Sequence, residues 1–306
     1  MIRPLPIPTC CLFAILAIVF TIIAGCGEAD PVQTAKAADP QADWPTVIRI
    51  GLIPTEGGAD TQQRFDPLQD HLTAQLGRPV ELIAASHYQG VITAMANQQI
   101  EFAWLGPKSY VEAANRANAQ ALILEVSIFG DPGYHSVFIV PSESEIQSLE
   151  DARGKRFVFT DPNSTSGSLI PTLVLRDVLD TTADQFFSEV RYSGSHSTSA
   201  IQVAQGEVDV AAVGDIDLRK LLSRRTVPPE SIRIIHRSDL IPGSPLAARA
   251  DIPESLKAAF TDAMMMINDD PAMLERFQIG GYQPATDETY DIIRAVQAMV
   301  AQQTDP

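Results

Sequence analysis

Short apolar runs alternate with longer segments of helical spacing along the first half of the chain. The run at residues 47–53 predicts a strand, and Phe65–Leu76 then repeats its apolar side chains every three or four residues, as an amphipathic helix does. The same pattern continues with strands at 80–85, 102–105 and 121–126 and with helices at 88–97 and 108–117. Strands alternating with helices in this way predict an α/β fold with a mainly parallel sheet flanked by helices.

A second block of the same kind follows a break at Asp131-Pro132-Gly133. Its predicted strands are 134–140, 156–160, 190–192, 208–213 and 232–235, and its predicted helices are 168–179 and 197–205. A second break follows at Leu240–Gly243, after which residues 253–303 are predicted to be essentially helical. Two breaks around one block predict a chain that crosses to a second lobe and returns. The predicted lobes are 47–132 with 241–306, and 133–240, with a ligand in the cleft between them.

The segment Asp161–Gly167 is the strongest candidate for ligand binding. It follows the predicted strand 156–160, where ligands of parallel sheets usually bind, and Ser164 is a favourable N-cap for the next helix. Backbone N–H groups after the cap have no preceding carbonyl, and the helix dipole favours an anion there. The hydroxyls of Ser164, Thr165 and Ser166 add donors. We interpret this segment, called the cradle below, as an oxyanion-binding loop.

The simpler interpretation of the cradle is an ordinary helix capped by Ser164, without ligand binding. The seven residues taken alone favour this interpretation over an oxyanion site. Gly167 is expected to keep the approach of an anion free of a side chain. Pro171 falls inside the predicted helix, where it removes one hydrogen bond and should produce a kink.

The charge of the chain narrows the range of partners. With 22 basic and 38 acidic residues among 306, the formal net charge is -16. This acidity argues against nucleic acid and against anionic lipid as partners. It leaves a small anionic ligand open, because capture by backbone and hydroxyl donors is local.

The first residues are typical of a targeting segment. Arg3 precedes an apolar run, Cys11–Ile23, that is too short to span a bilayer comfortably. The sequence Ile23-Ala24-Gly25-Cys26 resembles a bacterial lipobox, which predicts cleavage after residue 25, acylation of Cys26 and anchoring to a membrane; the alternative is a plain signal peptide. Residues 26–46 are predicted to form a flexible tether. Cys10 and Cys11 leave with the signal and Cys26 would then be the remaining cysteine, which excludes a disulfide and a cysteine metal site from the mature chain.

Six short segments, in the same order along the chain, resemble the phosphonate- and phosphite-binding solute-binding proteins of ABC transporters. They are Phe102–Pro107, Pro132–Val137, Asp161–Gly167, Gly194–His196, Gly206–Asp209 and Leu240–Gly243. The resemblance implies the two-lobed type II periplasmic-binding fold, which closes on a phosphorus oxyanion. It further implies a monomer without cofactor or metal that works outside the cytoplasm and delivers its ligand to the permease subunits of a transporter.

The resemblance also implies which side chains contact the ligand. Ser164, Thr165 and Ser166 would be the principal contacts to phosphorus oxygens. Tyr88, Tyr134 and His196 would add hydroxyl and imidazole donors. Without the resemblance, a tyrosine at a strand start is usually an edge residue and a single histidine a surface or capping residue.

Two positions bear on the kind of ligand. Family members that take aminoalkylphosphonates are expected to hold the ammonium with acidic residues, one of them after the Ile-Pro-Gly turn. Here Ser244 follows that turn, and the apolar Ile216 lies between Asp215 and Asp217. We therefore expect a small oxyanion such as phosphite, methylphosphonate or phosphate. Asp215 is the candidate acceptor for a hydroxyl on phosphorus, although it could equally be a helix N-cap.

Two other functions compete with transport. An enzyme would need a nucleophile with its base, a phosphate-loop lysine or metal carboxylates, and the sequence shows no such motif. A binding lipoprotein that feeds a sensor would have the same ligand site as one that feeds a permease. Genes for a permease and an ATPase beside this gene would favour transport, whereas a neighbouring sensor kinase would favour signalling.

Overall fold

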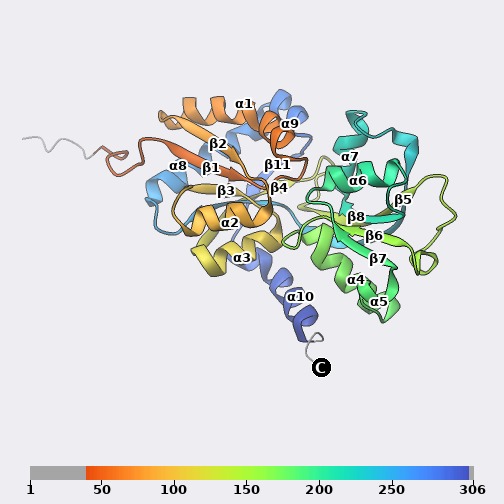
Figure 1. Cartoon of the computed structure of the whole chain (residues 1–306). Coiled ribbons are helices and arrows are strands. Elements are labelled where there is room, and N and C mark those ends of the chain that lie inside the picture. The colour runs from red at the N-terminus through yellow and green to blue at the C-terminus, as the bar shows by residue number, and fades with distance from the viewer. Residues whose placement is uncertain (1–38, 303–306) are drawn as a thin grey trace, which may run out of the picture. The chain divides into compact units, whose positions relative to one another are not determined.

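The computed structural model describes residues 39–302, which form two sheets with helices on both faces (Figure 1). The first sheet has six strands in the order β11-β4-β10-β3-β1-β2. With its helices it is called the first lobe below. Its elements are β1 (Ile48–Leu52), α1 (Gly58–Leu76), β2 (Val80–Ala84), α2 (Tyr88–Ala96), β3 (Phe102–Trp104), α3 (Pro107–Ala117), β4 (Ala119–Val126), β10 (Pro245–Arg249), α8 (Glu254–Met265), α9 (Pro271–Phe277), β11 (Gly281–Pro284) and α10 (Asp291–Gln302).

The second sheet has five strands in the order β7-β6-β8-β5-β9 and, with its helices, is called the second lobe. All of its strands come from the segment between β4 and β10. Its elements are β5 (Gly133–Pro141), β6 (Arg156–Phe159), the π-helical turn η2 (Thr165–Leu169), α4 (Ile170–Leu179), α5 (Ala183–Phe186), β7 (Glu189–Tyr192), α6 (His196–Ala204), β8 (Val210–Gly214), α7 (Asp215–Ser223) and β9 (Ile232–Pro242).

Both sheets are mixed. In the first lobe β1 pairs in parallel with β2 and β3, whereas β10 runs antiparallel between β3 and β4. In the second lobe β6 pairs in parallel with β7 and β8, whereas β5 runs antiparallel to β8 and β9. The strands predicted as parallel do share one direction. The reversed strands are β5 and β10, each of which follows a crossing between the lobes, and β11, which pairs antiparallel with β4.

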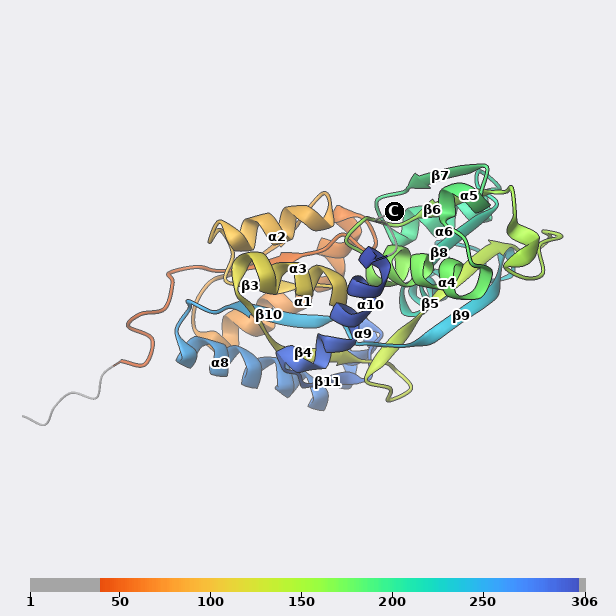
Figure 2. The same cartoon turned by 90° about the horizontal axis from the view of Figure 1, so that it is seen from below.

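Apolar side chains from helices on both faces bury the first sheet. On one face Phe102 of β3 stacks on Phe260 of α8, with ring centroids 3.9 Å apart, and Phe65 of α1 packs against Trp104. Helices α2 and α3 pack together on the other face, as Figure 2 shows from below. The carboxyl ends of β1 and β3 and the start of α2 are thereby held toward the second lobe.

Two chain segments cross between the lobes side by side. The first leads from β4 to β5 and the second from β9 to β10. The N–H of Gly243 donates to the carbonyl of Pro132 at 3.0 Å, and the N–H of Glu125 donates to the carbonyl of Ser244 at 3.0 Å. A Cβ on Gly243 would lie 2.1 Å from the carbonyl oxygen of Glu125, so this close approach requires glycine.

The structure differs from the sequence expectations at the crossings and near the carboxyl end. β9 continues through the predicted break to Pro242, and β10 follows where no strand was predicted. Within the region predicted to be essentially helical, Gly281–Pro284 forms β11 and pairs with β4. Both missed strands are short and sit beside turn-forming glycine and proline, so their pairing with β4 comes from tertiary contacts and not from a local pattern.

The ordered domain starts earlier than the predicted tether boundary suggests. Trp44 is buried, and its indole N–H donates to Ser255 Oγ at 2.9 Å. The side chain of Gln41 donates to the carbonyl of Leu76 at 3.2 Å. These residues therefore belong to the first lobe. The predicted signal segment, Cys26 and the rest of the tether up to residue 38 lie outside the described residues.

The kink expected at Pro171 is replaced by a change of helix type. The chain forms a π-helical turn over Thr165–Leu169, and Pro171 then occupies the second position of α4. The N–H groups of Leu169 and Ile170 reach back to Ser164 and Thr165, and the next such bond would need the carbonyl of Ser166. Pro171 has no N–H, and that carbonyl accepts the hydroxyl of Ser136 at 2.6 Å instead. Among residues 39–302, no helix is long and apolar enough to cross a membrane.

Candidate functional site

The cradle begins directly after β6 and is shaped by its own hydrogen bonds. Ser164 caps the π-helical turn, its Oγ accepting the N–H of Gly167 at 3.0 Å. The carbonyl of Gly167 accepts the N–H of Thr160 at 2.8 Å. A Cβ on Gly167 would lie 2.2 Å from Thr160 Oγ1, so glycine is required for packing against β6. That reason differs from the expected one, which was free access for an anion.

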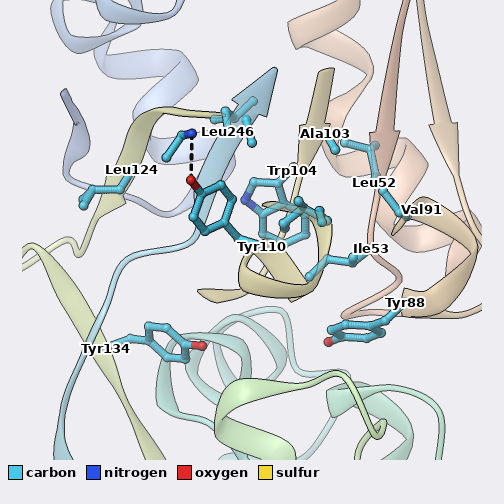
Figure 3. Close-up of a cluster of buried hydrophobic side chains, with 14 of the residues drawn as sticks. Leu52, Ile53, Tyr88, Val91, Ala103, Trp104, Tyr110, Leu124, Tyr134 and Leu246 are labelled. Carbon is cyan, nitrogen blue, oxygen red and sulfur yellow. Dashed lines mark hydrogen bonds between the residues drawn. The ribbon is translucent and has the colours of Figure 1, made fainter. Parts of the chain in front are cut away.

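Ser166 and Tyr88 place buried hydroxyls at the lobe interface. Each residue is 1% exposed, and neither hydroxyl makes a well-formed hydrogen bond among the described residues, although Ser164 lies near the hydroxyl of Tyr88 and Tyr134 near that of Ser166. Tyr134 of β5 lies opposite Tyr88, and Figure 3 shows the two phenol hydroxyls pointing toward one another. Burial raises the pKa of both phenols, with the charge of Asp217 adding to it, so both carry their protons at neutral pH and can donate.

Thr165 joins the lobes instead of standing free. Its Oγ1 accepts the backbone N–H of Lys108, at the start of α3, at 2.8 Å. The ammonium of Lys108 in turn donates to the carbonyl of Pro162. Since the hydroxyl of Thr165 still carries a proton, it can donate to a ligand while it accepts from Lys108.

His196 is buried at the start of α6 and has a defined tautomer. Its Nδ1 accepts the backbone N–H of Gly214 at 3.1 Å, so a neutral ring must carry its proton on Nε2. Nε2 lies 3.5 Å from Ser164 Oγ and 3.7 Å from Asp217 Oδ2. Burial lowers the pKa of His196, and Asp217 opposes this only in part. The ring is therefore a neutral donor directed at the cradle.

Asp217, and not the expected Asp215, is the acid of this cluster. Both carboxylate oxygens of Asp215 are engaged elsewhere, by the N–H of His135 at 2.9 Å and by Arg237 at 2.8 Å. Asp217 is 5% exposed. A Cβ placed on Gly214 would lie 2.6 Å from Asp217 Oδ2, 3.2 Å from Ser166 Oγ and 3.4 Å from the Tyr134 ring. Glycine at 214 thus lets an acid, a hydroxyl and a phenol meet.

A second group of buried charges lies beyond Asp217, between α7 and the first lobe. It consists of the buried Glu56, Arg64, Glu125 and Lys220 together with the more exposed Arg224, and is called the charged interface below. Arg64 forms an ion pair with Glu56 at 3.0 Å, and Arg224 reaches across from the second lobe to the same carboxylate at 2.5 Å. The sequence analysis missed this group. Its available signal was the spacing of Asp217, Lys220 and Arg224, which falls on one helical face.

The chemistry of the site is that of oxyanion binding. Hydroxyls, phenols, a neutral imidazole and backbone N–H groups are donors, and the carboxylate of Asp217 is an acceptor for one protonated oxygen. The described part of the chain holds no group of three or more His, Cys, Asp or Glu that could bind a metal ion. The donors come from both lobes, so a bound oxyanion would contact both.

Comparisons with known proteins identify the family of the chain. A family model described as "ABC transporter, phosphonate, periplasmic substrate-binding protein" matches residues 50–290. The phosphonates-binding periplasmic protein of Escherichia coli K12 is 33% identical over 247 residues, covering 78% of this chain and 72% of that protein. The phosphate-import protein PhnD of Mycolicibacterium smegmatis is 30% identical, with 92% of each chain covered.

Solved structures show the same fold. The binding protein component of an ABC phosphonate transporter from Pseudomonas aeruginosa superposes with a TM-score of 0.79 at 29% identity, covering 85% of this chain and 87% of that one. PhnD1 of Prochlorococcus marinus in complex with methylphosphonate superposes with a TM-score of 0.77 at 20% identity, covering 86% and 99%. The chain therefore belongs to the family of periplasmic substrate-binding proteins of phosphonate ABC transporters.

Proposed function

We propose that this protein captures a small phosphorus oxyanion that carries a proton, such as phosphite, methylphosphonate or phosphate, between its two lobes for import. The observation that carries this proposal is the position of two buried hydroxyls at the lobe interface, Ser166 Oγ and Tyr88 OH, which make no well-formed hydrogen bond among the described residues although Tyr134 and Ser164 lie near them. Buried polar groups are nearly always hydrogen-bonded, because an unmade bond costs free energy. An oxyanion between the lobes would supply acceptors to both.

The remaining donors complete such a site. Ser164 and Thr165 each keep a hydroxyl proton after accepting their backbone N–H groups. His196 directs Nε2–H to the same region, and Tyr134 adds a second phenol. Hydrogen bonds to a charged oxyanion contribute about 1.5–3 kcal/mol each.

Asp217 supports the choice of a protonated ligand. An ionised carboxylate only accepts hydrogen bonds, so it repels a fully ionised oxygen and binds a hydroxyl. Phosphite, methylphosphonate and phosphate keep such a hydroxyl in part of their population near neutral pH, whereas sulfate does not. The role that the sequence assigned to Asp215 is thus proposed for Asp217. The names of the relatives, which include phosphonates, phosphate and methylphosphonate, agree with this ligand class.

The delivery of the ligand follows from the family. Substrate-binding proteins of ABC importers act outside the cytoplasm and present their ligand to the permease subunits. We further propose that the protein is a monomer attached to the membrane through lipid on Cys26, as the lipobox-like sequence at residues 23–26 suggests.

Titration calorimetry of the purified protein with phosphite, methylphosphonate, phosphate and sulfate tests the ligand class. We expect at least one phosphorus oxyanion to bind, and sulfate to bind more weakly than the tightest of them. Asp217→Asn replaces a group that only accepts hydrogen bonds with an amide that also donates. The difference in affinity between the tightest phosphorus oxyanion and sulfate should therefore become smaller. If sulfate binds wild-type protein tightest, or if no phosphorus oxyanion binds, the proposed function is wrong.

A further inference from the structure

Helix α7 presents a row of charged side chains to the first lobe. Asp217, Lys220 and Arg224 lie three and four residues apart and so share one face of the helix. Asp217 lies beside the cradle, Lys220 lies one turn farther from it, and Arg224 ends the row at Glu56. The row therefore leads from the ligand site along the charged interface.

Lys220 is the least expected member of this row. It is 1% exposed, and its Nζ has no hydrogen-bond partner among the described residues. The charges that act on it are those of Arg64, Glu125, Asp217 and Glu56. Burial and Arg64 lower the pKa of Lys220 to about 8, which leaves it mainly protonated at neutral pH. A buried ammonium thus lies within electrostatic range of Asp217, which is beside the cradle, and of Glu125, without an ion pair to either carboxylate among the described residues.

Those two carboxylates are the groups that an amino-substituted ligand would seek. An aminoalkylphosphonate carries an ammonium a few ångströms from its phosphorus, and a buried ammonium needs a nearby carboxylate. Asp217 touches the cradle, and Glu125 at the end of β4 is fully enclosed, its pKa raised by burial and lowered in turn by Lys220. The absence of an acid at Ser244 and Ile216 is therefore not a sufficient reason for excluding such ligands.

We propose that Lys220 determines ligand specificity, serving as an internal counter-ion to Asp217 and Glu125 so that aminoalkylphosphonates are excluded. This inference rests on the proposed function. A second ammonium brought beside Lys220 meets a like charge in a site from which water is excluded, where the repulsion is weakly screened. A phosphonate without an amine meets no such repulsion. Lys220 acts on the ligand through charge and is a positioning residue for the two carboxylates.

Ethylphosphonate and 2-aminoethylphosphonate are the probes, since they differ in the ammonium. We expect wild-type protein to bind ethylphosphonate more tightly than 2-aminoethylphosphonate. Lys220→Met keeps the length of the side chain and removes its charge, so the preference for ethylphosphonate should fall by about tenfold or more, the effect of removing one charge repulsion. Lys220→Arg should keep the wild-type preference because it retains the cation.

Arg219→Met is the matched control. It removes a positive charge from the adjacent position of the same helix, and that charge also acts on Asp217. The Arg219 guanidinium nevertheless stacks over the ring of Phe129, 5.0 Å from its centroid, outside the charged interface. The ratio of the two affinities should stay at its wild-type value. Titration calorimetry of all four proteins gives the ratios, and thermal unfolding confirms that each variant is folded.

The outcomes separate this inference from the proposed function. If Lys220→Met binds ethylphosphonate and its preference is unchanged, the role of Lys220 is refuted while oxyanion binding stands. If Lys220→Met does not fold, the affinities of wild-type protein for the two probes decide. Binding of 2-aminoethylphosphonate as tight as that of ethylphosphonate, or tighter, refutes the inference. If wild-type protein binds no phosphorus oxyanion, the proposed function fails and the inference fails with it.

Discussion

The backbone N–H of Gly214 donates to Nδ1 of His196 across 3.1 Å, and this bond joins the end of β8 to the start of α6. It fixes the imidazole as a neutral ring with its proton on Nε2, facing Ser164 and Asp217. A glycine is needed at 214 because a Cβ there would collide with the carboxylate of Asp217. One backbone position thus sets the tautomer of the histidine and makes room for the acid.

Ser166→Ala should weaken oxyanion binding about tenfold to a hundredfold without unfolding the protein, because it removes one hydrogen bond to a charged ligand. Its hydroxyl makes no well-formed hydrogen bond among the described residues and lies near that of Tyr134, which makes it a cleaner probe than Thr165, whose Oγ1 accepts the backbone N–H of Lys108. Calorimetry with phosphite or methylphosphonate measures the change. The control is Thr172→Val, which removes a hydroxyl bonded to the carbonyl of Ser168 in α4. Unchanged affinity in Ser166→Ala would remove Ser166 from the site.

His196 should remain neutral at a pH where a free imidazole is half protonated. Burial lowers its pKa below 6.5, so the unfolded chain binds a proton first as the pH falls. The contribution of His196 to stability is therefore complete above pH 6.5 and is lost as the pH falls toward its lower native pKa. Nitrogen-15 NMR should show the Nε2–H tautomer at pH 7. Unfolding titrations between pH 7 and 5 should show a smaller loss of stability in His196→Gln. A native pKa above 6.5 would contradict this prediction.

The lobes should close on the ligand as two bodies about the paired crossings. The bond from Gly243 to Pro132 and the bond from Glu125 to Ser244 hold the crossing segments together, so motion is expected to concentrate there. Small-angle scattering should give a smaller radius of gyration at saturating ligand than without it. An unchanged radius at confirmed occupancy would argue against such a hinge.

Arg224→Gln should weaken ligand binding about fivefold by destabilising the closed arrangement, because a partly buried ion pair contributes about 1 kcal/mol. Arg224 belongs to the second lobe and Glu56 to the first, and neither is part of the cradle. Arg191→Gln is the control, because it breaks an exposed pair with Glu189 inside the second lobe. Equal affinities of the two variants would show that the pair with Glu56 does not contribute to closure.

Cys26→Ser should move the protein from the membrane to the soluble fraction. The expectation rests on the apolar run that ends in Ile-Ala-Gly-Cys, since acyl chains on that cysteine would bind the bilayer. Fractionation of cells that express each form, followed by immunoblotting, measures the distribution. A variant that is still processed and still sediments with membranes would place the anchor elsewhere.

The sequence by itself determined the class of fold and the place of the cradle. Short apolar runs that alternate with segments of helical spacing are visible within a few residues, and they predicted strands alternating with helices. Ser164 caps the turn after β6, as its position in the sequence predicted. The capping signal is local because the serine side chain and the N–H that it accepts lie three residues apart.

Only the tertiary structure decided which acid and which cation of α7 are buried. Asp215 and Asp217 are two residues apart, so α7 directs them about 200° apart, and the sequence does not show which side is buried. Strand β5 determines the side, because the backbone N–H of His135 donates to Asp215 and Asp217 then points into the interior. The surroundings of Lys220 are decided in the same way. The charges that act on it, those of Glu125, Arg64 and Glu56, are distant in the sequence and belong to the first lobe, so they reach Lys220 only where the two lobes meet.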